Sequence, residues 1–427
     1  MTRIAILGCG WSGLVSSIRL RSLYPAADVI CVDRAFDGGL LTSARLGPYL
    51  FDAGGSHVVF STRREVVETI ISMGGEWVFR SRSAYVLLDG FFVPYPFENG
   101  MYVLPPESRA RYGISLIRAF MNNRGERPAN FLQWILGTFG EEVARDYLIP
   151  YNEKIWKRPL DEMSADWVYI PGRLPLPSLE DIVKAVAGLP TVGYAEQSTF
   201  YYPKRGGIYS QWRATYEKAA SLGVRFVKEE VREVRRAGSE FVVNGWLRAD
   251  RIVNTLPLRD FVHMLVPEPP SEVLEAASRL DYNSVVVVGI GLRQAAPPHH
   301  WVYVPDRRHV FHRYAWISNY GEDVPPGRSA LIAEVTVPPN TSVDLEGVKA
   351  DVLRGLSDLG VVEEGAVEVV EAWFHRYGYP IYTLSHGRDV ATIEQYLANI
   401  GIATFGRWGN WQYWNTDKIY EKAKALK

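Results

Sequence analysis

The chain has little cysteine. Cys9 and Cys31 are the only two among its 427 residues, so the cysteine framework that holds small secreted domains together is missing. Both fall within the first strand–turn–strand pattern, on different segments, and we interpret them as small buried hydrophobic residues rather than as a redox pair. This usage fits a reducing compartment, and we expect a cytoplasmic protein.

Long apolar runs and an excess of charge of one sign are also missing. The longest apolar run, 284–292, is too short to span a bilayer, and the first strand pattern begins at Arg3, which leaves no place for a signal peptide. The formal net charge of −1 gives no reason to propose a nucleic acid or an anionic membrane surface as a partner. Apart from the adjacent His299 and His300, the histidines lack the close spacing of metal ligands, so no metal site is expected.

The chain does contain enough apolar sequence to build large cores. Hydrophobic residues make up 47% and charged residues 22% of it, as in soluble globular proteins. Its length allows two or three domains. We expect part of the 13 Trp and 24 Tyr to lie in the core and part to line a pocket for a flat or sugar-like ligand.

The first thirty-odd residues follow the order of a dinucleotide-binding unit. Its parts are the strand pattern 3–7, the glycine turn 8–13, the helix pattern 14–23, the strand pattern 28–32 and the acid Asp33.

Each part of this unit has a physical reason. Gly8 allows a tight turn, Gly10 lets a pyrophosphate approach the backbone, and Gly13 lets the helix pack closely on the strand. The helix N-terminus offers unpaired N–H groups and the positive end of its dipole to the phosphates. Asp33 would accept hydrogen bonds from an adenosine ribose. A lone glycine fingerprint is weak evidence, but the flanking strands and the acid predict dinucleotide binding.

Two further glycine pairs favour FAD over NAD. Gly38 and Gly39 come shortly after Asp33, and Gly55 precedes Ser56 and His57. Simple NAD-dependent dehydrogenases need neither element. Flavoproteins commonly have both, because an extended FAD must pass several backbone segments.

The rest of the chain predicts an inserted helical part and a second sheet. Apolar residues at helical spacing predict helices over 107–122, 130–139, 141–149 and 178–187, with an irregular polar and aromatic segment over 150–163. Strand patterns occur at 84–93, at 230–234 and repeatedly from 282 to 373.

The predicted fold class is therefore α/β: a doubly wound FAD-binding domain with an inserted helical subdomain and an antiparallel β-sheet substrate domain. The predicted domains are the FAD-binding domain over 1–80, 200–262 and 385–427, the mostly helical domain over 81–199, and the antiparallel-sheet domain over 263–384.

Two later segments carry more specific motifs. They are the run Tyr151-Asn-Glu-Lys154-Ile-Trp156 with Gly172-Arg173-Leu-Pro after it, and the run Gly406-Arg407-Trp-Gly-Asn-Trp-Gln-Tyr413-Trp-Asn415-Thr-Asp417 near the C-terminus. With the N-terminal fingerprint, the loop 202–207 and Tyr379-Pro380, they make the chain resemble a FAD-binding superfamily. It includes amine oxidases, protoporphyrinogen oxidases and, most similar of all, UDP-galactopyranose mutases. Two features depart from the pattern: Asp33 stands where Glu is usual, and segment 281–292 reads like the apolar strand of amine-oxidase relatives.

The resemblance implies a redox-neutral reaction on a nucleotide sugar. In the mutases the N5 atom of reduced FAD attacks the anomeric carbon, the diphosphate leaves, and the sugar recloses in the other ring size. Departure of a diphosphate calls for fixed cations, and arginine suits this role because its fork pairs with phosphate oxygens. The resemblance implies the catalytic residues Arg173, Arg407 and His57 and the substrate-binding residues Tyr151, Lys154, Trp156, Arg313, Arg376 and Tyr413.

Some of these residues have a plainer interpretation as well. Trp156 would stack on a base or sugar, or dock a helix; Lys154 would be a phosphate ligand or a solvated helix end. For FAD, the resemblance implies contacts from Gly8, Gly10, Ser12, Gly13, Asp33, Arg34, Gly38, Gly39, Ser56, His57, Val231, Gly406, Arg407, Asn415 and Asp417.

Two other functions stay open. One is a FAD-dependent oxidoreductase of the amine oxidase or protoporphyrinogen oxidase type, and the other is a non-catalytic flavoprotein partner in glycan synthesis. A diphosphate site needs at least two arginines converging near the flavin, whereas an oxidase would want an apolar, aromatic cage. In each case we expect a small-molecule ligand, and the sequence is compatible with an oligomer.

Overall fold

The computed structural model describes residues 2–122, 125–170, 176, 178–191, 198–363 and 365–427. A five-stranded parallel sheet, in the order β20-β13-β1-β2-β9, contains both strands of the N-terminal unit. Its strands are β1 (Arg3–Leu7), β2 (Asp28–Asp33), β9 (Arg225–Lys228), β13 (Arg251–Asn254) and β20 (Ile402–Thr404). The prediction of a parallel sheet around the N-terminal unit is confirmed.

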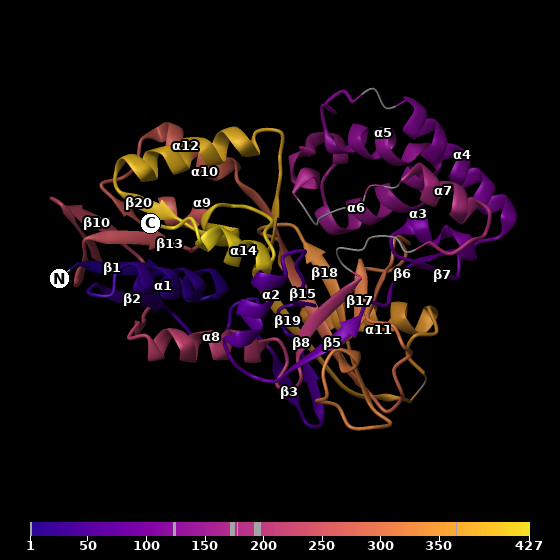
Figure 1. Ribbon diagram of the computed structural model, residues 1–427, viewed down its shortest axis with the longest axis horizontal. Helices are drawn as coiled ribbons and strands as arrows, with labels where there is room; N and C mark the ends of the chain where they lie inside the picture. The colour runs from indigo at the N-terminus through magenta and orange to yellow at the C-terminus, as the bar shows by residue number, and fades with distance from the viewer. Residues whose placement is uncertain (1, 123–124, 171–175, 177, 192–197, 364) are drawn as a thin grey trace.

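Helices cover both faces of this sheet. Because successive strand side chains point to opposite faces, Ile4 and Ile6 join one hydrophobic cluster and Ala5 and Leu7 join another. The first cluster includes residues of α1 (Trp11–Leu23) and α8 (Tyr209–Ser221), and the second includes residues of α10 (Ser271–Arg279) and α12 (His386–Asn399). Figure 1 shows these two pairs of helices on opposite sides of the sheet.

The second large sheet has seven strands in the order β19-β15-β18-β17-β16-β6-β7. All its described pairs are antiparallel except β16 with β6. Its strands are β6 (Ala84–Leu88), β7 (Phe91–Pro94), β15 (Asp281–Leu292), β16 (Trp301–Tyr303), β17 (Arg313–Trp316), β18 (Ser329–Val337) and β19 (Val367–Ile381). The sheet is thus mixed but mostly antiparallel. The domain boundaries stay a prediction, although β6 and β7, assigned to the helical part, pair with this sheet.

A helical unit stands apart from the parallel sheet (Figure 1). It is built from α3 (Phe97–Gly100), α4 (Pro106–Asn122), α5 (Phe131–Val143), α6 (Ile149–Trp156) and α7 (Leu179–Val186). The helix predicted from 178 is present as α7, and Ser178 caps it, because its hydroxyl accepts the N–H of Asp181. The irregular segment predicted over 150–163 is wrong in its first half, because α6 occupies it. Pro150 stands in the first turn of that helix, where a missing N–H costs nothing.

A predicted strand over 230–234 is also wrong. The N–H groups of Arg232 and Glu233 donate to the side-chain oxygen of Asn244, so they do not pair with a neighbouring strand. The strand β10 begins only at Val234.

The remaining α-helices and β-strands are β3 (Ala44–Leu46), β4 (Tyr49–Phe51), α2 (Arg64–Ser72), β5 (Trp77–Ser81), β8 (Thr199–Pro203), β10 (Val234–Ala237), β11 (Glu240–Val243), β12 (Leu247–Ala249), α9 (Leu258–Val262), β14 (Leu265–Val266), α11 (Leu345–Asp358), α13 (Gly406–Gly409) and α14 (Thr416–Ala423).

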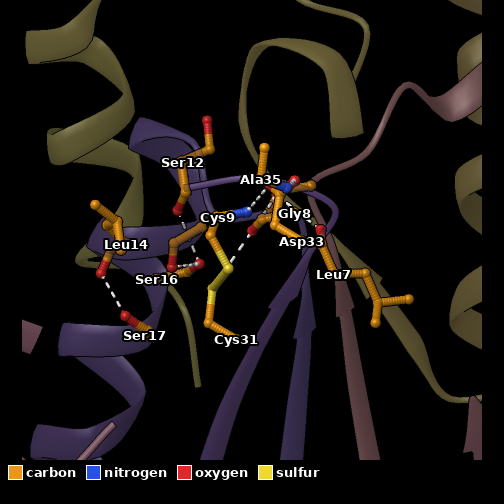
Figure 2. The surroundings of a disulfide bond; sticks show 12 residues. Leu7, Gly8, Cys9, Ser12, Leu14, Ser16, Ser17, Cys31, Asp33 and Ala35 are labelled. Carbon is orange, nitrogen blue, oxygen red and sulfur yellow. Dashed lines mark hydrogen bonds between the residues drawn. A yellow bond between two sulfur atoms is a disulfide. The ribbon is translucent and has the colours of Figure 1, made fainter. Parts of the chain in front are cut away.

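The interpretation of the cysteines as independent residues is wrong. Cys9 and Cys31 form a disulfide bond, which Figure 2 shows below the glycine turn. Cys9 lies two residues after the end of β1, Cys31 lies on the adjacent β2, and the register of the two parallel strands brings their Cα atoms to 5.9 Å. Their burial is as predicted.

Two further observations concern membranes and metals. Within the described ranges, no helix is both long and apolar enough to cross a bilayer. The same residues contain no group of three or more His, Cys, Asp or Glu side chains arranged to hold a metal ion.

Candidate functional site

A cavity of about 790 Å³ lies where the parallel sheet, the seven-stranded sheet and the helical unit meet. Its wall includes the glycine turn at one end and aromatic side chains of α5 and α6 at the other. A volume in this range is typical of ligand and cofactor sites.

The glycine turn has the shape that a pyrophosphate site requires. A Cβ atom on Gly13 would lie 1.9 Å from the carbonyl oxygen of Gly8, so only glycine allows α1 to pack this closely. At Gly10, in contrast, a Cβ would meet no protein atom within 4 Å. Gly10 is also the N-cap of α1 and provides no side-chain cap. The first N–H groups of the helix are therefore open to an anion.

Asp33 stands beside this turn. Its carboxylate accepts the N–H of Cys9 at 2.6 Å and that of Ala35 at 3.2 Å. Burial raises the pKa of Asp33 above its ordinary value, and the two backbone donors oppose that shift. A carboxylate oxygen accepts more than one hydrogen bond, so Asp33 can also bind a ribose hydroxyl.

Most of the residues predicted to bind FAD share this wall. They are Gly8, Gly10, Ser12, Asp33, Arg34, Gly38, Gly39, Ser56, His57, Val231, Arg407 and Asn415. Gly13 and Gly406 lie behind this wall, where they allow close packing. A Cβ atom on Gly406 would lie 2.1 Å from the hydroxyl of Ser12, so glycine at this position lets α13 pack against α1. Asp417 belongs to the first turn of α14, after the wall residues Asn415 and Thr416. The residues present therefore fit a bound dinucleotide.

Aromatic side chains from distant parts of the chain line another part of this cavity, which is called the chamber below. The ring of Trp156 packs edge-on against those of Tyr379 and Tyr413, at centroid distances of 6.3 and 5.9 Å. Tyr379 and Tyr413 pack against each other at 5.8 Å. Tyr151 packs edge-on against Tyr303 at 5.5 Å. The structure thus brings together the residues of the two later motifs.

Glu334 on β18 is a buried carboxylate in the chamber wall, and three other residues donate hydrogen bonds to it. It accepts hydrogen bonds from Arg313 at 2.9 Å, from the hydroxyl of Tyr379 at 2.8 Å and from the N–H of Ser56 at 3.1 Å. Burial alone would raise the pKa of Glu334, but the positive charge of Arg313 outweighs it and the pKa falls to about 2. Burial lowers the pKa of the adjacent His312 to about 3. Glu334 therefore carries the charge that neutralises Arg313.

His57 is a neutral side chain at the chamber wall. Its Nδ1 lies 2.8 Å from the carbonyl oxygen of Gly55. Because a carbonyl only accepts, Nδ1 carries the proton and Nε2 is the acceptor. Burial, followed by the charge of Arg407, lowers the pKa of His57 to about 4.

The predicted cations have different surroundings. Arg407 donates to the carbonyl oxygen of Trp414, with its guanidinium 5.0 Å from the ring centre of Tyr413. Arg376 donates to the hydroxyl of Tyr282 and lies 3.3 Å from the carboxylate of Asp260. Two of the proposed diphosphate ligands, Arg313 and Arg376, thus have carboxylate partners in the protein. Arg173 lies outside the described residues.

Lys154 is neither a solvated helix end nor part of the cavity wall. It is 6% exposed, and its ammonium group donates to the carbonyl oxygens of Val304 and Asp306, both at 2.7 Å. Burial lowers its pKa to about 7. Lys154 therefore links α6 to the loop after β16.

Sequence reasoning missed Glu334, His312 and Arg82. Arg82 lies in the chamber wall, 4.5 Å from the ring centre of Tyr95 and 4.9 Å from that of Trp301. A single acid within the otherwise apolar run 330–335 is a signal for a buried ion pair, and it points to Glu334. We find no comparable sequence signal for Arg82.

Known proteins share this architecture. The sequence matches the pattern of a family described as flavin-containing amine oxidoreductases over residues 92–388. The crystal structure of a reduced UDP-galactopyranose mutase superposes with a TM-score of 0.90 and 26% sequence identity, covering 99% of this chain and 92% of that one.

More distant structures share the fold. A putative protoporphyrinogen oxidase from Exiguobacterium has a TM-score of 0.75 at 17% identity and covers 99% of this chain and 97% of its own. An oxidoreductase from Methanosarcina mazei has a TM-score of 0.67 at 14% identity, with each chain fully covered. These two likenesses concern the fold alone.

Proposed function

Because the chain belongs to the flavin-containing amine oxidoreductase family, we propose that it is a flavin-dependent mutase that interconverts the ring forms of a nucleotide sugar. The likeness to a UDP-galactopyranose mutase over 99% of the chain supports this proposal. UDP-galactose is accordingly the first substrate to test.

One observation carries the proposal. Trp156 on α6, Tyr379 on β19 and Tyr413 before α14 meet in one aromatic cluster, with the guanidinium of Arg407 over the ring of Tyr413. These residues come from the motifs that distinguish the mutases within the superfamily. Their convergence in the cavity that contains the glycine turn supports a sugar site next to the cofactor site.

The chain's own residues have clear tasks in such a reaction. Bound FAD, when reduced, supplies the nucleophile for the anomeric carbon. Arg407 places a fixed positive charge in the chamber, which stabilises a departing phosphate. His57 holds its proton on Nδ1 and offers Nε2 as an acceptor for a hydroxyl proton. The aromatic walls exclude water and present flat surfaces to the apolar face of a sugar.

A second function, FAD-dependent oxidation of an amine or a porphyrinogen-like ring, rests on a different observation. Glu334 neutralises Arg313 and Asp260 pairs with Arg376, which leaves fewer free cations for a diphosphate. The cavity wall also contains many aromatic side chains, which would suit an apolar oxidase substrate.

An anaerobic assay tests the two functions together. Purified flavin-loaded protein is incubated with UDP-galactopyranose or UDP-galactofuranose, with and without dithionite. We expect interconversion only with the reduced protein. Absence of interconversion, together with bleaching of the oxidised flavin by an amine or another donor, would contradict the mutase and support the oxidase. If neither occurs, a non-catalytic flavoprotein becomes the better interpretation.

Variants connect the assay to the site. Arg407→Ala and Tyr413→Phe should lower turnover, because the first removes a positive charge from the cavity wall and the second removes a hydroxyl from it. Arg64→Ala is the matched control, since Arg64 is 91% exposed on the surface helix α2. Equal turnover in all three variants would exclude Arg407 and Tyr413 from the reaction.

A further inference from the structure

The disulfide occupies a special place in the cofactor cradle. Cys9 lies between Gly8 and Gly10, inside the glycine turn that lines the cavity. Cys31 lies on β2, two positions before Asp33. One covalent bond thus joins the segment suited to a pyrophosphate to the segment suited to a ribose (Figure 2).

Hydrogen bonds hold the same turn from several sides. The N–H of Cys9 donates to the carboxylate of Asp33 at 2.6 Å, and its carbonyl oxygen accepts from the indole of Trp212 at 2.9 Å. The carbonyl oxygen of Gly8 accepts from the hydroxyl of Thr255 at 3.1 Å. A movement of Cys9 therefore displaces Asp33 and the neighbouring glycines as well.

Both cysteines are almost completely buried. Cys9 is 2% exposed and Cys31 is fully buried. Two unbonded thiols need more room than a disulfide, and a close-packed interior transmits such an expansion to its neighbours. Cys9 belongs to the glycine turn, where Gly8 has a φ of +94°, and a glycine backbone can change conformation at less steric cost than other residues. Reduction should therefore shift the turn away from β2.

We propose that the Cys9–Cys31 disulfide is a redox-sensitive clamp on the flavin cradle. The disulfide form binds FAD more tightly than the dithiol form, and bound FAD shields the disulfide from thiols. The clamp is opened by a small dithiol reductant, which transfers two electrons and two protons to the cysteines and leaves as its own cyclic disulfide. This inference depends on flavin binding and not on the reaction proposed above.

Linkage makes the proposal quantitative. If reduction weakens FAD binding by a given factor, FAD must hinder reduction by the same factor. We expect a factor of about tenfold or more, within the usual range for coupled sites. For a two-electron couple, tenfold corresponds to about 30 mV in the midpoint potential of the cysteine pair.

Two measurements on the full chain test the clamp. The dissociation constant of FAD is measured by flavin fluorescence on oxidised apoprotein and on apoprotein treated with dithiothreitol. The midpoint potential is measured with and without FAD in dithiothreitol redox buffers, by counting alkylated cysteines. We expect weaker FAD binding after reduction and a more negative midpoint potential with FAD bound. Equal dissociation constants in the two forms would overturn the proposal.

Controls separate the clamp from general damage. Circular dichroism must show that the reduced apoprotein keeps its fold; loss of the fold would itself contradict a local clamp. The variant Cys9→Ala/Cys31→Ala should bind FAD with an affinity that dithiothreitol does not change. If this variant does not fold, the wild-type comparison still decides. Two alkylated cysteines in the untreated, denatured protein would overturn the proposal at once.

Discussion

Replacement of Glu334 by glutamine should destabilise the protein strongly. Glu334 is 2% exposed and is the only described carboxylate within hydrogen-bonding distance of Arg313. The amide of Glu334→Gln keeps the size of the side chain but not its charge. Arg313 would then be left with its charge uncompensated in the chamber wall.

The magnitude follows from the pKa of Glu334. It falls from an ordinary 4.5 to about 2, and at about 1.4 kcal/mol per pKa unit the ionised carboxylate adds about 3 kcal/mol to the free energy of unfolding. Breaking a buried ion pair by removing one partner costs about 3–5 kcal/mol, which agrees. Because the folded-state pKa is depressed, this stability is present above about pH 4.5 and is lost as the pH falls toward 2.

Urea unfolding followed by tryptophan fluorescence measures this effect. At pH 7 we expect Glu334→Gln to lower the free energy of unfolding by about 3 kcal/mol, and its stability should vary less than that of the wild type between pH 4.5 and 2. The matched control is Glu368→Gln. Glu368 also pairs with arginines, Arg293 and Arg328, and its pKa is also lowered to about 2, but its side chain is 19% exposed, against 2% for that of Glu334. A loss in Glu334→Gln no larger than in Glu368→Gln would refute the role of burial.

Three more predictions concern the cradle, the chamber and pH. Gly13→Ala should unfold the nucleotide-binding sheet, since the new Cβ meets the carbonyl oxygen of Gly8. Gly10→Ala should leave the melting temperature of the apoprotein unchanged but lower its affinity for FAD. Calorimetry measures the first effect and flavin fluorescence the second. Trp156→Ala should lower the free energy of unfolding by about 3–5 kcal/mol, and a value below 1 kcal/mol in urea unfolding would contradict its packing role. Since the pKa of His312 is about 3, the unfolded chain takes up the proton first, and stability should fall as the pH drops from about 6.5 toward 3. His312→Asn should flatten that slope in urea titrations; an unchanged slope would show that other groups cause it.

Local patterns were enough to predict the nucleotide-binding unit. The spacing of Gly8, Gly10 and Gly13 reflects contacts within the unit itself, such as the approach of Gly13 to the carbonyl oxygen of Gly8. The same holds for Ser178, whose cap involves only the first turn of α7. In both places the residues that interact lie close together in the sequence, so a pattern records the contact directly.

Contacts between distant segments were harder to predict. The pairing of Arg313 with Glu334 depends on the antiparallel register of β17 and β18, which no local pattern specifies. The disulfide depends in the same way on the register of β1 and β2. Predicted charges such as Arg313 and Arg376 were identified by residue type, but whether a charge is free depends on its neighbours in space.

The order of strands in the parallel sheet has a consequence for synthesis of the protein. β1 is made first, yet one of its partners is β13, at residues 251–254, and the edge strand β20 comes at residues 402–404. Pairing of such distant segments is slow, because a long loop must close before any contact stabilises it. The nucleotide-binding sheet therefore cannot be completed on the ribosome until nearly the whole chain has emerged. The edge of β1 is open to wrong partners until β13 emerges, and the edge of β13 then stays open until β20 does.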